Sequence, residues 1–137
     1  MTRRLSVWIV ATAVLALSGC STSRQPTGPT AALNEEFTLA PGGRMWIGGT
    51  TVSLQFQHVD SDSRCPADAI CVLGGDAVVR IGVEENGRAT GYELHTGTMA
   101  PVRHDDLVIS LVALAPYPFS ARPIAPSDYR ATLRVTR

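Results

Sequence analysis

The chain contains no lysine, and its basic residues are not clustered. All 12 of its Lys-or-Arg residues are Arg, and they balance 12 Asp and Glu residues, so the formal net charge is zero. A nucleic-acid-binding surface concentrates basic side chains on one face. No segment of this sequence does so, and we therefore exclude nucleic acid as a partner. The absence of lysine is attributed to genome base composition rather than to function.

The sequence also lacks an apolar run long enough to cross a bilayer. Its longest run, residues 5–17, is shorter than the roughly 20 residues that a spanning helix needs. This run follows Arg3 and Arg4 and leads into the small residues Ser18 and Gly19. A positive region, an apolar region and a small-residue cleavage site are typical of an export signal. Residues 1–19 are therefore predicted to be a signal peptide.

The end of this signal, Leu17-Ser18-Gly19-Cys20, resembles the lipobox of bacterial lipoproteins. The resemblance implies that Cys20 is acylated and becomes the mature N-terminus. The protein is then exported and anchored through its lipid to the cell membrane. In a two-membrane cell, Ser21 after the cysteine favours the outer membrane. The alternative is an ordinary secretory signal or an N-terminal membrane anchor that ends in a cysteine.

Beyond the signal, the sequence divides into a polar segment and one domain. Residues 20–36 are rich in Pro, Thr and Ser, which predicts a lipidated cysteine followed by a flexible tether spanning about 20 Å. Residues 37–137 are long enough for a single small domain.

The domain lacks helical periodicity, and its apolar residues alternate with polar ones as in half-buried strands. Asn86-Gly87 is a strong hairpin signal. Residues 107–114 are more continuously apolar, which predicts a strand buried on both faces. Four prolines interrupt residues 115–126 and exclude a regular helix or ladder there. The expected fold is all-β: a single antiparallel β-sandwich or small β-barrel of about seven or eight strands.

Cysteine is scarce, with three in the chain. When Cys20 is assigned to the lipid, Cys65 and Cys71 remain as a pair in an exported protein, and an oxidising compartment favours a disulfide between them. Their spacing fits neither a Cys-x-x-Cys redox site nor a zinc site with two ligand pairs. Closing so short a loop is expected to stabilise the domain by about 2 kcal/mol.

The residues around these cysteines resemble the signature of an uncharacterised family of small exported bacterial proteins. That signature reads Asp-Ser-Arg-Cys-Pro, a short gap, then Cys, an apolar residue, Trp, Ala and Gly, and it matches here at Asp62, Ser63, Arg64, Cys65, Pro66, Cys71, Val72 and Gly75. Leu73 replaces the usual Trp as a smaller apolar plug, and Gly74 replaces Ala. The resemblance implies the domain limits and the disulfide but no activity.

Three aspartates in this region are weak candidates for a calcium site, because carboxylate oxygens are the ligands that Ca²⁺ prefers. They are Asp60, Asp62 and Asp68, and their spacing is not that of an EF-hand. Acidic residues in loops more often form Asx-turns or pair with a neighbour such as Arg64. We therefore assign no metal and no cofactor to the chain.

The three histidines are separated widely in the sequence. In the predicted strand 51–59, His58 continues the every-second-residue series of apolar side chains and therefore points to the same face, which predicts partial burial. With His95 and His104 it could form a copper or zinc site. Unrelated, hydrogen-bonded histidines are the preferred interpretation.

No catalytic motif is present. The sequence contains neither a Gly-x-Ser-x-Gly elbow nor a phosphate-binding glycine loop. Paired carboxylates occur at Glu84-Glu85 and Asp105-Asp106, beside turns where charge usually serves solvation. No catalytic residue is therefore assigned.

The leading functional hypothesis is a non-enzymatic, membrane-tethered domain that binds an envelope protein, peptide or polysaccharide. The candidate binding loop contains Asp62, Ser63, Arg64 and Pro66, which are expected to be exposed, because rigid loops on a β-scaffold often carry binding residues. The alternative is a structural component of the cell envelope without a specific ligand, and a hydrolase with an unfamiliar site is a third hypothesis.

Overall fold

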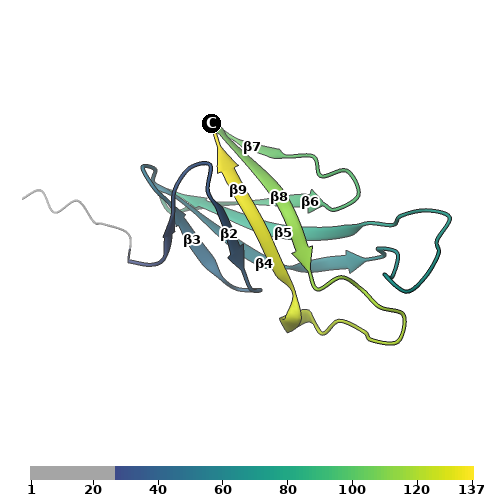
Figure 1. The fold of residues 1–137 in the computed structure, drawn as a ribbon. Helices are drawn as coiled ribbons and strands as arrows, with labels where there is room; N and C mark the ends of the chain where they lie inside the picture. Colours follow the sequence, from purple (N-terminus) through teal and green to yellow (C-terminus); the bar gives the residue numbers. More distant parts are fainter. Residues whose placement is uncertain (1–26) are drawn as a thin grey trace, which may run out of the picture.

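The computed structural model describes residues 27–137, which form two packed β-sheets (Figure 1). One sheet has the strand order β1-β3-β4-β5-β6 and the other β2-β9-β8-β7. The strands are β1 (Thr30–Ala31), β2 (Glu36–Leu39), β3 (Arg44–Ile47), β4 (Val52–Asp62), β5 (Ala77–Glu85), β6 (Arg88–His95), β7 (Val102–His104), β8 (Leu107–Ala115) and β9 (Arg130–Thr136). A 3-10 turn, η1 (Pro126–Asp128), precedes β9.

The all-β prediction is confirmed, and the two separate sheets make the fold a sandwich. In the described part of the chain, no helix is long and apolar enough to span a membrane. The predicted signal peptide, Cys20 and the first part of the tether lie outside the described residues.

The hydrophobic core lies between the sheets and follows the period-two pattern of the sequence. In β5, every second residue is buried, beginning with Ala77. In β9, the same alternation buries Ala131, Leu133 and Val135. Burial of one face per strand is what two stacked sheets require.

The turns also follow the sequence. Asn86 and Gly87 connect β5 to β6 with φ values of 50° and 77°, as the hairpin prediction requires. The proline-rich segment after β8 is irregular apart from one bridge, between Phe119 and Arg122, and η1.

Two predictions about the fold are wrong in detail. Strand β8 is not buried on both faces, because buried residues alternate with half-buried ones along most of its length. The tether also ends earlier than residue 36, since β1 pairs in parallel with β3 and Ala31 is buried in the core. A strand of two residues contains no measurable period, so the sequence pattern could not reveal it.

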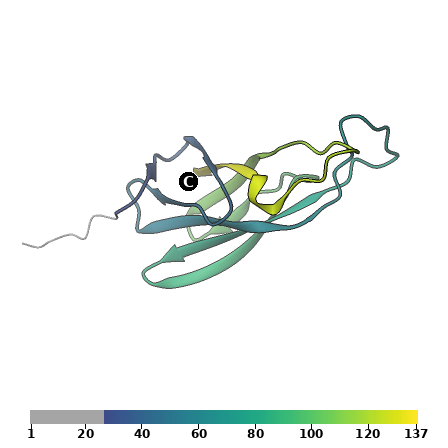
Figure 2. The same cartoon turned by 90° about the horizontal axis from the view of Figure 1, so that it is seen from below.

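The described N-terminus and the Cys65–Cys71 loop lie at opposite ends of the sandwich (Figures 1 and 2). Near the N-terminus, Trp46 donates its backbone N–H to Pro29, and the adjacent end of the β4–β5 ladder pairs Val52 with Glu85. The other end of that ladder pairs Asp62 with Ala77. Because a strand rises about 3.3 Å per residue, the length of β4 separates the two ends by roughly 30 Å.

Candidate functional site

The stapled loop, residues 63–76, connects β4 to β5 and contains a disulfide between Cys65 and Cys71. The predicted bond is therefore confirmed, with a Cα–Cα distance of 5.9 Å. The Cys65 N–H also donates to the Gly74 carbonyl at 2.9 Å. A disulfide of this kind indicates an oxidising, extracytoplasmic environment.

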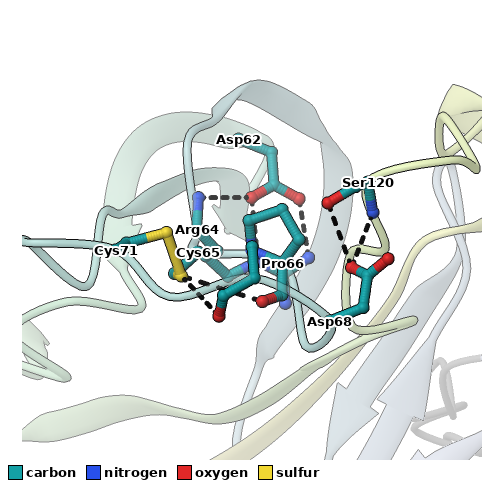
Figure 3. Close-up of a disulfide and its surroundings, with 8 residues drawn as sticks. Asp62, Arg64, Cys65, Pro66, Asp68, Cys71 and Ser120 are labelled. Carbon is teal, nitrogen blue, oxygen red and sulfur yellow. Dashed lines mark hydrogen bonds and ion pairs between the residues drawn. A yellow bond between two sulfur atoms is a disulfide. The ribbon is translucent and has the colours of Figure 1, made fainter.

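At the base of the loop, Arg64 and Asp62 form a buried ion pair (Figure 3). The Arg64 side chain donates from Nε to Oδ1 of Asp62 at 2.8 Å and from the terminal Nη2 to Oδ2 at 2.6 Å. Such a bidentate pair is among the strongest polar contacts in proteins. Arg64 is only 8% exposed, so the prediction that it offers an accessible binding group is wrong.

The same arginine joins the loop to the end of β8. It donates to the carbonyls of Leu114 at 2.7 Å and Pro116 at 3.0 Å, and its guanidinium lies 5.4 Å from the centre of the Tyr117 ring. On the other side, the Tyr129 hydroxyl donates to Oδ2 of Asp62 at 3.0 Å. Arg64 therefore holds together segments that are about fifty residues apart in the sequence.

These contacts determine the charge state of Asp62. Burial by itself raises the pKa of this carboxyl, but hydrogen bonds from Arg64 and Tyr129 outweigh burial and hold the pKa below its ordinary value of 3.8. The burial of Tyr129, with its bond to Asp62, raises the pKa of that phenol. The pair is consequently charged at neutral pH.

The second attachment of the loop is between Ser63 and Asp76. The two residues exchange three hydrogen bonds of 2.7–3.1 Å through their backbones and the Ser63 hydroxyl. The neighbouring Gly75 has a φ of +70°, and a Cβ at this position would lie 1.8 Å from the Ser63 carbonyl oxygen. Only glycine fits this close approach of two backbone segments.

A third attachment joins the loop to the proline-rich segment. The Ala67 N–H donates to the Pro118 carbonyl at 2.9 Å. Asp68 accepts hydrogen bonds from the N–H and hydroxyl of Ser120 at 2.8 and 3.1 Å (Figure 3). The N–H bond of Ser120 is the main reason that the pKa of Asp68 is lowered. The polar residues of the loop thus hold its shape.

The tip of the loop has the opposite character. Ile70 and Val72 are fully exposed, and Leu73 is 81% exposed. Leu73 therefore does not fill an apolar site inside the domain, as the sequence had suggested. The sequence analysis also missed that these three residues form an exposed apolar group. The signal was present in the run Ile-Cys-Val-Leu, which follows Pro-Ala-Asp-Ala and precedes two glycines. We call Ile70, Val72 and Leu73 the apolar tip.

Two pockets lie beside the loop, and Arg64 lines both of them. The first, of about 430 Å³, is lined by Met99, Leu114 and Tyr117 together with the loop glycines. The second, of about 540 Å³, is lined mainly by the proline-rich segment and includes Pro66 and Phe119. This end of the sandwich therefore combines exposed aliphatic side chains with one mainly apolar recess and one recess of mixed character.

The three candidate calcium ligands do not converge. Asp62 and Asp68 have the partners described above, and Asp60 accepts hydrogen bonds from Arg80 and His58 at 2.7–3.0 Å. Bonding to Arg80 is the main reason that the pKa of Asp60 is lowered. Each carboxylate thus has its own donors, and the three form no shared cation site.

The histidines do not converge either. A β-bulge between Phe56 and His58 shifts the strand register, so His58 is exposed rather than partly buried. His95 binds Asp76 through Nδ1 at 2.6 Å, whereas His104 contacts Tyr92 at 3.0 Å. The pattern of strand 51–59 could not reveal the bulge, because bulges depend on pairing with β5.

No protein-family model matches the chain, and searches of curated proteins and of solved structures give no match. The fold and site therefore define the class of molecule: a β-sandwich with a disulfide-stapled loop and an apolar tip at one end. The resemblance of the cysteine loop to an uncharacterised exported family stays a prediction.

Proposed function

We propose that the chain is a membrane-tethered envelope lipoprotein whose β-sandwich binds a protein partner through the apolar tip of the stapled loop. The proposal rests on the exposure of Ile70, Val72 and Leu73 on a loop that is fixed at its base. Isolated exposed apolar residues need no explanation, but a contiguous group on one rigid projection is typical of an interaction surface.

The energetics favour such a role. Burying one large aliphatic side chain contributes about 1.5–3 kcal/mol, and none of the three tip residues obtains this within the domain. A partner with an apolar recess would supply the burial. Since the disulfide and the Arg64 contacts already order the loop, binding costs little conformational entropy.

The position of the tip favours a protein over the anchoring membrane. A lipid on Cys20 would attach the chain at the end that carries β1, and the tip lies at the opposite end, roughly 30 Å away by strand rise (Figure 1). The loop from Cys65 to Gly75 also contains no Arg or Lys to attract anionic lipid headgroups. The tip is therefore presented away from the membrane surface.

The alternatives have less support. A purely structural envelope component does not require an exposed apolar tip. For a hydrolase, the carboxylates of the stapled end already have donors, as at Asp62 and Asp68. A protein-binding domain uses the features that the other two hypotheses leave unexplained.

Site-specific photo-crosslinking in the producing cell tests the binding proposal. A photoreactive amino acid at Val72 is expected to give one discrete protein adduct, and a second substitution, Ile70→Ser, is expected to remove it. The matched control position is Ala89, which is exposed on β6 at the other end of the sandwich. Adducts with lipid only, or the same adducts from both positions, would refute the proposal.

The lipid anchor needs its own test. Full-length chain is expected to incorporate radiolabelled fatty acid and to fractionate with membranes, and Cys20→Ser is expected to abolish both. Incorporation that persists in Cys20→Ser would contradict the lipobox assignment without affecting the proposal for the tip.

A further inference from the structure

A second cluster of chemically active side chains lies at the end of the sandwich opposite the stapled loop. Glu85 ends β5, His104 ends β7, and Asp105 begins the turn to β8 with a φ of 51°. One ligand atom from each residue lies within 4.8 Å of the others. The cluster borders a pocket of about 450 Å³ at the edge where β6 of one sheet faces β7 of the other.

Nε2 of His104 is the unusual atom of this cluster. It is buried, and among residues 27–137 it has no hydrogen-bond partner. Buried polar atoms are nearly always paired, so an unpaired one needs an explanation. The nearest carboxylate oxygen, Oε2 of Glu85, lies 3.5 Å away. That distance exceeds the roughly 2.7–2.9 Å of a charge-assisted hydrogen bond.

The same distance suits two ligands of one metal ion. With Zn–N and Zn–O bonds of about 2.0–2.2 Å, two ligands of a tetrahedral zinc lie about 3.4 Å apart. A buried imidazole nitrogen and a carboxylate oxygen at this separation have the geometry of two ligands around one cation. Asp105 is exposed on a turn and can rotate to complete a third ligand, while the pocket leaves a fourth position open.

The side chains of His104 and Glu85 are both oriented by hydrogen bonds from neighbouring residues. The Tyr92 hydroxyl bonds Nδ1 of His104 at 3.0 Å, and the Thr51 hydroxyl donates to Oε1 of Glu85 at 3.1 Å. Metal-binding histidines almost always use their second nitrogen in this way, and ligating carboxylates are hydrogen-bonded in turn. The bond between the Tyr92 hydroxyl and Nδ1 orients the ring so that Nε2 of His104 faces Glu85.

We propose that Glu85, His104 and Asp105 bind a divalent transition metal of the zinc class. Imidazole combined with carboxylates suits zinc and its neighbours better than calcium, which prefers oxygen ligands. Arg88 also lines the pocket and opposes a cation, but two carboxylates leave the cluster with a net negative charge. The site would lie at the membrane-proximal end and is separate from the apolar tip.

Calorimetry with zinc chloride on the full chain, purified in detergent and stripped of metal, tests this site. One zinc per chain is expected, with a micromolar dissociation constant. Glu85→Gln, His104→Ala and Asp105→Asn are each expected to weaken binding at least tenfold, and Tyr92→Phe about tenfold. Calcium chloride is expected to bind at least a hundredfold more weakly than zinc.

Matched controls are available beside each ligand. Glu84 pairs with Arg44 and Asp106 with Arg137, so Glu84→Gln and Asp106→Asn are expected to change affinity less than twofold. His58→Ala tests an exposed surface histidine and is also expected to have no effect. Zinc binding weaker than about 1 mM, or unchanged binding in His104→Ala, would overturn the proposal.

A spectroscopic measurement keeps the test decisive if His104→Ala fails to fold. In the wild-type chain, zinc is expected to shift the Nε2 resonance of His104 and to leave His58 and His95 unchanged. Cobalt at the same site is expected to give the visible absorption of a tetrahedral ion. A zinc-dependent shift at His58 instead of His104 would overturn the assignment.

Discussion

Replacing Arg64 by methionine is expected to destabilise the domain more than any other single loss of charge that we consider. Methionine retains much of the apolar stem but removes the guanidinium. Asp62, whose side chain is 10% exposed, would then be a buried carboxylate supported mainly by Tyr129. The carbonyls of Leu114 and Pro116 would lose their donor as well.

The magnitude follows from the burial of the pair. Removing one partner of a buried ion pair costs about 3–5 kcal/mol, because the other charge stays uncompensated. A small domain is stabilised by only about 5–15 kcal/mol in total, so this loss is a large fraction. For a domain near 100 residues, it corresponds to a fall in Tm of more than about 10 °C.

Urea denaturation of the oxidised chain, with a thermal melt in parallel, measures the effect. Arg80→Met is the matched control, since Arg80 also pairs with Asp60 and Glu93 but on the surface, where solvent screening leaves an ion pair little effect on stability. Adding Asp62→Asn to Arg64→Met should restore part of the stability, because it removes the unpaired charge. If Arg64→Met costs no more than Arg80→Met, the reasoning is refuted.

The remaining predictions concern the same loop. Changing both Cys65 and Cys71 to serine should lower the free energy of unfolding by about 2 kcal/mol and reduce crosslinking at the tip; an unchanged urea midpoint would contradict this. Gly75→Ala should destabilise the domain by more than about 2 kcal/mol in the same assay, because φ is positive and backbone lies in the way. Since the folded-state pKa of Asp62 is below 3.8, its contribution is complete above that pH and is lost on further acidification, so acid titration should show a shallower decline in Asp62→Asn.

The sequence predicted those features of the fold that depend on local pattern. Alternation located β5 and β9 because the two faces of a strand meet different environments wherever it pairs. Asn86-Gly87 located a hairpin because both residues tolerate positive φ. Strand β1 and the bulge before His58 were missed, since both are defined by pairing with residues elsewhere in the chain.

In the candidate site, too, the sequence predicted the local features and missed those that depend on tertiary contacts. The sequence identified the loop, its disulfide and the exposed Ser63, but it wrongly placed Arg64 on the surface and missed the apolar tip. Arg64 is a surface residue by type, and it is buried because the segment around Pro116 supplies carbonyl acceptors for its guanidinium. Ile70 is a core residue by type, and it is exposed because a loop of seven residues closed by a disulfide cannot fold back to cover its own tip. Exposure at both positions depends on tertiary contacts.

Stability and binding are separable on this loop because different residues supply them. No stabilising contact described above involves a side chain of the apolar tip: besides the disulfide, Arg64 pairs with Asp62, Ser63 with Asp76, and Asp68 with Ser120. Side chains that are exposed in the folded domain contribute little to its free energy, so Ile70→Ser should leave the urea midpoint unchanged, while the side chain still determines contact with a partner. A scaffold of this kind can change its binding specificity through the tip without losing its fold. A lower urea midpoint in Ile70→Ser would show instead that the tip packs within the domain and is not free for a partner.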